Sequence, residues 1–442
     1  MKIQLSDRFD YGKLIRFTLP SIGMLVFTSI YGVVDGYFVS NYVGEKSFAA
    51  VNLIMPVLMI LSMFGFMFGT GGSALIAKTL GEGDKEKANR IFSMLVWVSA
   101  LAGVILAVAG IVFLPQIAAL LGAEGELLED CVLYGRCFLA ALPLFMLQQE
   151  FQSFFVVAER PNLGLYTILA AGVMNMVLDA LVVGVCRGGL VGAAVATGIS
   201  QLVGAAVPLV YFARKNTSLL RLGAFRWDGK SLLKSCVNGS SELMSNISMS
   251  LVSMLYNAQL LKYYGDQGVS AYGVLMYVSL IFSGVFIGYS VGIAPVVGYH
   301  YGAGNHGELK GLLQKSTVLV GVFSVCMFAA SLLLASPLAR LFVGYNAELT
   351  DLTVYAFRIF SFSFLFCGFA IFASGFFTAL NNGVVSAVIS FLRTLVFQVA
   401  AILLLPLLFG VDGIWYSIVV AEVFAVLVAV VFLFALRKKY RY

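Results

Sequence analysis

Two polar side chains that could bind a cation lie inside an apolar stretch between Leu163 and Val185. This stretch is long enough to cross a bilayer as a helix, and it carries one amide, Asn175, and one carboxylate, Asp179. Because the two residues are four apart, they share a face of that helix. A carboxylate at the bilayer centre costs roughly 2.5–3.5 kcal/mol on insertion scales, so a proton, a cation or a partner usually neutralises it. The pair therefore indicates a cation site of the kind that a cation-driven transporter needs.

The composition indicates that the surrounding solvent is lipid. Of 442 residues, 60% are hydrophobic and 11% are charged, and the mean hydropathy is +0.96. A soluble protein of this length could not bury that much apolar surface. The six cysteines are scattered without a CxxC motif, so we expect neither a disulfide framework nor a metal site. No P-loop and no nucleophile–base constellation is visible, so we expect no enzyme activity, no cofactor and no nucleic-acid partner.

Apolar runs of spanning length recur twelve times, which predicts an all-α polytopic membrane protein. The helices are expected at about 14–40, 47–77, 91–114, 131–157, 163–185, 189–213, 232–261, 268–298, 312–336, 352–379, 383–407 and 410–436.

Lysine and arginine are concentrated in alternate connecting segments, which hold 21 of the 28 basic residues. Cytoplasmic loops carry such an excess, so we expect both termini to be cytoplasmic. The basic segments are the N-terminus, 78–90, 159–162, 214–234, 299–315 and 437–442.

The second half of the chain repeats the first. A shift of 221 residues superimposes glycines along most of each half, for example Gly71 on Gly292, Gly81 on Gly302 and Gly189 on Gly410. Each half has six spans and so enters the membrane in the same orientation, which predicts two six-helix lobes related by a parallel repeat. We expect an N-lobe at 1–213, a cytoplasmic linker at 214–231 and a C-lobe at 232–442.

Several motifs together resemble the multidrug and toxic compound extrusion (MATE) family of cation-coupled exporters. Their order and spacing carry the resemblance, which covers essentially the whole chain. They are YGVVDGYFVSNYVG at 31–44, GGSALIAKTLGEGD at 71–84 and its echo GIAPVVGYHYGAGN at 292–305, ERPN at 159–162, NMVLD at 175–179 and GAAVAT at 192–197.

The resemblance implies site residues in the N-lobe. Asp35 and Asp179 match the family's cation-binding carboxylates, and Asn175 and Thr197 match the neutral ligands. Pro20 matches a proline at which the first helix can bend, since proline lacks the N–H that the helix needs. The coupling ion is left open between H⁺ and Na⁺.

The C-lobe contains fewer candidate site residues. Glu242 matches a glutamate in the seventh span of one family branch, but the tenth span has no carboxylate in its apolar interior. Tyr256 stands where the 221-residue shift places Asp35. We take Glu242 and Tyr256 as candidate substrate-binding residues. We expect Glu150 to pair with Arg160 at the membrane interface.

The resemblance thus implies a secondary active multidrug efflux transporter. It would export amphipathic or cationic drug-like compounds in antiport with H⁺ or Na⁺, as a monomer in the lipid of a bacterial plasma (inner) membrane. A flippase for lipid-linked precursors, from the same superfamily, is the alternative. It should line its cavity with arginine and lysine, and only Arg393 lies well inside a span.

Overall fold

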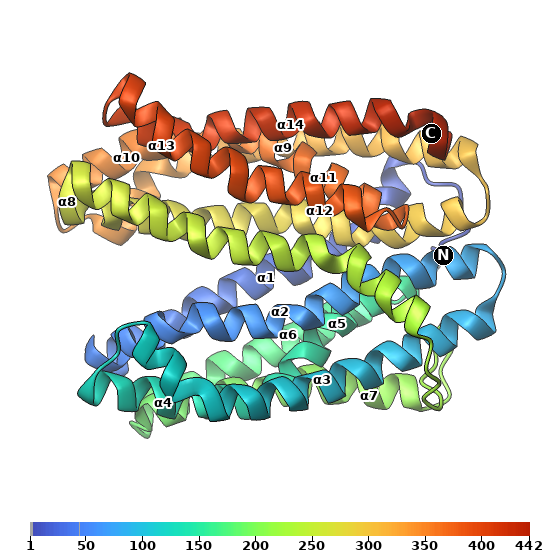
Figure 1. Ribbon diagram of the computed structural model, residues 1–442, viewed down its shortest axis with the longest axis horizontal. Helices are drawn as coiled ribbons and strands as arrows, with labels where there is room; N and C mark the ends of the chain where they lie inside the picture. The colour runs from blue at the N-terminus through green and yellow to red at the C-terminus, as the bar shows by residue number, and fades with distance from the viewer. Residues whose placement is uncertain (1–2, 44) are drawn as a thin grey trace.

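The computed structural model describes residues 3–43 and 45–442, and no strand occurs among them (Figure 1). The chain folds into successive helices, two of which, η1 and η2, are π-helices. They are α1 Tyr11–Tyr42, α2 Glu45–Gly81, α3 Lys85–Leu120, α4 Gly125–Ala140, α5 Leu142–Val157, α6 Pro161–Leu178, η1 Asp179–Val185, α7 Gly189–Ala213, α8 Gly229–Gly302, α9 His306–Val343, α10 Ala347–Ser361, α11 Phe364–Ala379, α12 Gly383–Phe391, η2 Leu392–Val396, α13 Phe397–Phe409 and α14 Asp412–Tyr440.

The described helices supply the twelve expected crossings. Nine stretches are individually long and apolar enough to span a bilayer. Two bent pairs, α4 with α5 at 53° and α10 with α11 at 48°, each add one broken span. α8 has 74 residues but reverses at Gly265, whose φ of 62° and ψ of −153° suit only glycine. Counting α8 as two crossings adds a twelfth to these eleven, so the predicted number of spans is confirmed.

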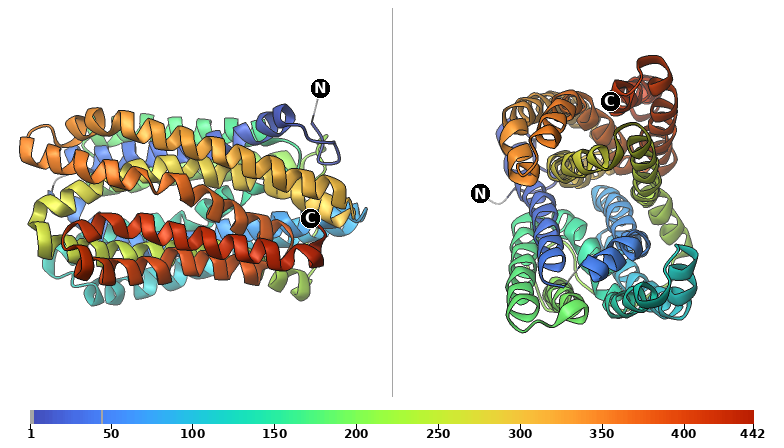
Figure 2. Two further views of the ribbon diagram at one scale, coloured as in Figure 1. Left: turned by 90° about the horizontal axis from the view of Figure 1, so that it is seen from above. Right: turned by 90° about the vertical axis from the view of Figure 1, so that its left-hand side faces the viewer.

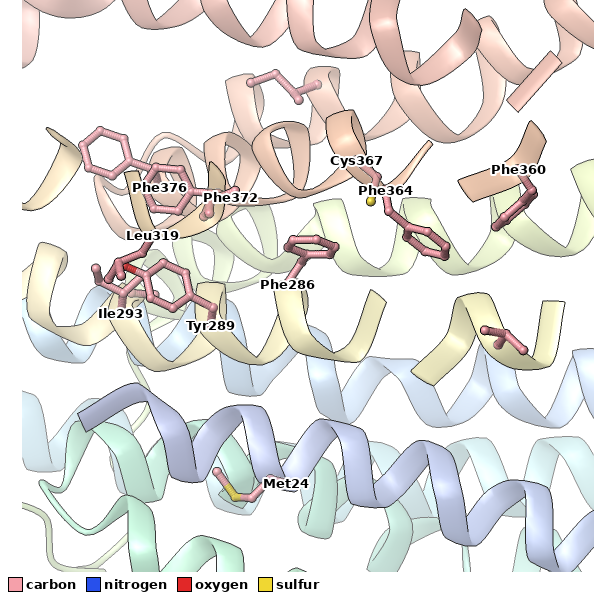
Figure 3. Close-up of a cluster of buried hydrophobic side chains, with 14 of the residues drawn as sticks. Met24, Phe286, Tyr289, Ile293, Leu319, Phe360, Phe364, Cys367, Phe372 and Phe376 are labelled. Carbon is pink, nitrogen blue, oxygen red and sulfur yellow. The ribbon is translucent and has the colours of Figure 1, made fainter. Parts of the chain in front are cut away.

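The helices form two bundles, as predicted. α1 to α7 make up one and α8 to α14 the other, and the end-on view separates them (Figures 1 and 2). α1 also packs along α8, so it joins the two bundles. In the second bundle, Phe286 and Tyr289 of α8 lie opposite Phe364 and Phe372 of α11 and form a close-packed aromatic core (Figure 3).

The internal repeat predicted from the sequence is visible in the turns. Gly83 and Gly304, one repeat apart, lie just after the ends of α2 and α8 and have φ of 89° and 68°, in the left-handed region that favours glycine. The next residue of each copy, Asp84 or Asn305, caps the following helix by accepting a backbone N–H with its side chain. The repeated glycines are therefore scaffold positions.

The basic segments meet at one end of the molecule, where both termini also lie (Figure 1). Asn89 after the first basic turn accepts a hydrogen bond from the backbone N–H of Arg221 in the linker, at 2.7 Å. His300 at the end of α8 contacts the carbonyl of Asp7, at 3.2 Å. We call this the basic end.

The two bundles are in close contact toward the basic end. A Cβ added to Gly71 of α2 would lie 2.0 Å from the carbonyl oxygen of Ser235 in α8, and one added to Gly239 would lie 2.0 Å from that of Met67. Asn381 also donates to the carbonyl of Ala74 across the interface, at 3.1 Å. Backbones can approach this closely only where side chains are absent. The structure is therefore closed between the lobes at this end.

Candidate functional site

The structure brings together the two N-lobe carboxylates that the sequence placed far apart. α1 packs against α6 and η1, so that Asp35 of α1 faces Asp179 at the start of η1. The two carboxyl groups are close enough for their charges to interact. Because an ionised carboxylate is only an acceptor, a hydrogen-bonding contact needs a proton or a cation between the groups.

The helix geometry changes at the point where Asp179 lies. α6 ends at Leu178, and the next turn is a π-helix, so that Cys186 donates to the carbonyl of Leu181 at 2.8 Å. The wider turn runs into Gly188 and Gly189, and Gly189 has a φ of 58°. A single π turn inside a spanning helix often marks a functional site, because it leaves backbone and side chains less regularly packed.

Asp179 is shielded from solvent, Asp35 is half-buried with its Oδ1 enclosed, and both carboxylates are poor in donors. Asp179 is fully buried and Asn175 is 1% exposed. Apart from the carboxyl–carboxyl contact, Oδ1 of Asp35 and both Asp179 oxygens have no partner among the described residues, and neither does Nδ2 of Asn175. Buried oxygens without donors can hold a proton or coordinate a hard cation such as Na⁺.

Uncharged polar residues around this site were missed by the sequence reasoning. Tyr31, one turn before Asp35, interacts with Gln148 and Gln201, and Tyr134 lies within the electrostatic field of both carboxylates. Gln148 and Gln201 are each 3% exposed. A signal existed, because both glutamines stand inside apolar spans, where an amide needs a partner.

The structure gives Thr197 and Pro20 ordinary helical surroundings. The Thr197 hydroxyl donates to the carbonyl of Ala193 at 3.0 Å, which is the ordinary bond of a threonine in a helix. α1 runs unbroken through Pro20, which lies about 22 Å along the helix from Asp35.

The expected pair between Glu150 and Arg160 is wrong. Arg160 donates to the hydroxyl of Thr217 in the linker. Glu150 is fully buried, and neither of its oxygens has a hydrogen-bond partner in the described part of the chain. The chain turns sharply at Glu159, whose φ is 56°, and this directs Arg160 away from α5.

The C-lobe contains a charged cluster of a different kind. Nε of Arg393 in η2 donates to both oxygens of Glu422 in α14, at 2.9 and 3.1 Å. Glu242 of α8 lies within range of the Arg393 charge. The sequence reasoning missed Glu422, although a glutamate inside an apolar run was the signal.

Tyr256 contacts other residues of the C-lobe. Its hydroxyl donates to Oε1 of Gln398 at 2.9 Å, and its ring stacks on Tyr272 at 5.1 Å between centroids. Over residues 3–43 and 45–442, no group of three or more His, Cys, Asp or Glu side chains could hold a metal ion.

Comparisons with known proteins show what this chain is similar to. The sequence model of the MatE family matches residues 20–181 and 243–403, once in each half. The multidrug export protein MepA of Staphylococcus haemolyticus is 24% identical over 428 residues, which cover 96% of this chain and 94% of the relative. MepA of Staphylococcus aureus (strain MRSA252) is 25% identical over 429 residues, with the same coverage of 96% and 94%.

Solved structures share the fold. An outward-facing multidrug resistance MATE transporter superimposes with a TM-score of 0.92 at 23% identity, over 98% of this chain and 97% of the other. A MATE crystallised in complex with MaD3S has a TM-score of 0.89 at 25% identity, over 98% of each chain.

Proposed function

Because this chain belongs to the MATE family of membrane transporters, we propose that it exports amphipathic, often cationic, organic compounds from a bacterium in exchange for H⁺ or Na⁺. The staphylococcal relatives, which match 96% of this chain, are multidrug export proteins. Family members are transporters and not enzymes, so the polar sites are to be understood as binding sites.

The contact between Asp35 and Asp179 supports the coupling step best. A cation gradient drives export only if the cation binds one conformation better than the other. With Asp179 buried, Asp35 half-buried and few donors near either group, a proton or Na⁺ relieves the repulsion between the carboxylates and holds α1 against η1. Asn175 and Thr197 would supply neutral oxygens.

α1 is suited to carry this change to the other lobe. Beyond Pro20 it packs so closely on α8 that a Cβ at Gly288 would lie 2.5 Å from Cα of Ile22. Asp35 is on the same helix, farther along. Release of the cation at Asp35 frees that part of α1 while the part around Ile22 stays packed on the C-lobe, and Pro20, which lies in the packed part, allows a bend there.

Vesicles with separate gradients test this proposal. The purified protein would be reconstituted, loaded with a cationic dye and given either a pH gradient or a Na⁺ gradient. We expect one of the two gradients to drive dye transport. Transport under neither gradient, with dye binding intact, would reject cation antiport.

A flippase for lipid-linked precursors is disfavoured by the C-lobe. Its pyrophosphate would need free guanidinium or ammonium groups. Arg393 is already paired with Glu422, and Glu242 adds a second negative charge beside it.

We also propose the orientation and organisation of the chain. The positive-inside rule places the basic end in the cytoplasm, with the linker 214–231 between an N-lobe of 1–213 and a C-lobe of 232–442 in a monomer. On a cysteine-free background, Arg226→Cys should react with an impermeant thiol reagent only after the membrane is opened. Labelling of intact cells at this position would invert the topology.

A further inference from the structure

We propose that a cavity at the basic end of the N-lobe binds the phosphate headgroup of an anionic phospholipid, held by Arg16 of α1 and Arg160 at the start of α6. This site is separate from the pair of Asp35 and Asp179, and the inference does not depend on the proposed function. Its occupant would be a resident lipid and not a transported solute.

The cavity has a volume of about 470 Å³ and lies where the N-terminal segment, α1, α6, α7 and the linker meet. Its charged lining residues are Arg16, Glu159 and Arg160, so the lining carries one net positive charge. Phe17 and Leu163 form part of an apolar wall. A space of this kind, at the basic end of a set of spanning helices, suits a monoanionic group that is attached to hydrocarbon.

Arg160 has a hydrogen-bond donor that is not used. One of its terminal nitrogens donates to the hydroxyl of Thr217, but its Nε is enclosed and has no hydrogen-bond partner in the described part of the chain. The neighbouring Glu159 accepts the backbone N–H of Leu5 with its Oε1, at 2.8 Å. An enclosed N–H without an acceptor is unfavourable, and a phosphate oxygen would supply a charge-assisted bond.

The start of α6 also lacks a side-chain acceptor. At the corresponding turn of the C-lobe, Asn381 has a φ of 58°, and Asn382 caps α12 by accepting the backbone N–H of Val385. In the N-lobe, Glu159 has a φ of 56°, and the cap position holds Arg160, whose side chain can only donate. No side chain caps α6 among residues 3–43 and 45–442, and a phosphate can take that place at the N-terminus of a helix.

The surroundings of the cavity favour a lipid over a free phosphate. Tyr166 lines the cavity and is 63% exposed, and Leu19, on the same face of α1 as Arg16, is 58% exposed. Both spans begin at this end, at Tyr11 and Pro161. Acyl chains cover large apolar side chains that spanning helices expose, and tyrosine is frequent at the level of the headgroups. A phosphate held by the two arginines would therefore have lipid-facing surface beside it for its acyl chains.

Native mass spectrometry of the purified full-length protein tests the assignment. The protein in neutral detergent would be titrated with dioleoylphosphatidylglycerol, and with dioleoylphosphatidylcholine as the zwitterionic lipid with the same acyl chains. We expect one phosphatidylglycerol to bind about tenfold more tightly than phosphatidylcholine, because only the former leaves an uncompensated phosphate charge for the arginines. Arg16→Gln and Arg160→Gln should each remove most of that preference, whereas Arg16→Lys should keep part of it.

Two control variants separate the site from general effects. Thr217→Ala removes the bond between Arg160 and the linker but leaves both charges in place. Arg90→Gln removes an exposed arginine that lies at the same end and does not line the cavity. Both variants should keep the wild-type preference for phosphatidylglycerol. Inorganic phosphate, added as the soluble competitor, should not displace the lipid at equal concentration.

Three results would overturn the proposal. Equal binding of the two lipids by wild type, or an unchanged preference in Arg16→Gln and Arg160→Gln, would remove the site. An equal loss in Arg90→Gln would show that surface charge in general attracts the lipid. Displacement by inorganic phosphate at equal concentration would make this a site for a soluble anion. If Arg160→Gln does not fold, Arg16→Gln, which replaces an exposed side chain, decides the first point.

Discussion

Replacing Asp179 by asparagine keeps the shape of the side chain and removes its charge. The residue is fully buried, and its oxygens meet no donor among the described residues apart from the Asp35 carboxyl group. We therefore expect Asp179→Asn to fold, and to unfold at a higher temperature than wild type, because an ionised carboxylate inside the membrane costs roughly 2.5–3.5 kcal/mol on insertion scales.

The same change should abolish coupling. Two unit charges about 4 Å apart repel by about 4 kcal/mol at an effective dielectric constant of 20. A free energy of about 4 kcal/mol changes an equilibrium constant by about three powers of ten. The two carboxylates together should therefore bind a proton or cation that much more strongly than they would without the repulsion. With one carboxylate gone, the preference is lost, and a gradient can no longer bias one conformation over the other.

Binding and export should be measured side by side. In detergent, Asp179→Asn should still bind a cationic dye, with an affinity that no longer depends on pH or Na⁺. In vesicles, gradient-driven export should fall to the rate of protein-free vesicles. Export at the wild-type rate against a gradient would show that Asp179 is only a structural residue, and the coupling argument would fail.

Three further changes test the scaffold. Tyr256→Phe removes the hydrogen bond to Gln398 and should lower the free energy of unfolding by about 1 kcal/mol, but export should remain coupled, which transport in vesicles would check. Gly239→Val forces a side chain into space 2.0 Å from the Met67 carbonyl and should open the lobes at the basic end, whereas Gly273→Val, with nothing within 4 Å, should not; distances between spin labels on the two lobes would distinguish them. Asp228 caps α8, and hydrogen bonds from Ser231 hold its pKa below the usual value. Asp228→Ala should therefore lower stability by about 1 kcal/mol at neutral pH. That stability is present above the unfolded pKa, so the difference should shrink as pH falls through the folded pKa, as thermal unfolding across pH would show.

Much of the architecture follows from the sequence alone. The number of spans, their approximate bounds and the two-fold repeat depend on local composition, because any segment that crosses lipid must be apolar for about 20 residues and must satisfy its own backbone. Gly83 and Gly304 fall at helix ends for an equally local reason, since their positive φ values favour glycine. The pair Asn175 and Asp179 could be recognised because helical spacing alone places both on one face.

The tertiary structure decided which helices meet and which faces they present. Lipid is as apolar as a leucine side chain, so hydropathy does not record how a spanning helix is rotated or which neighbour it contacts. The contact of Asp35 with Asp179, the bond of Arg393 to Glu422 and the separation of Glu150 from Arg160 all depend on those rotations. The π-helical turns and the reversal of α8 at Gly265 add to this, because each changes the direction of the side chains that follow.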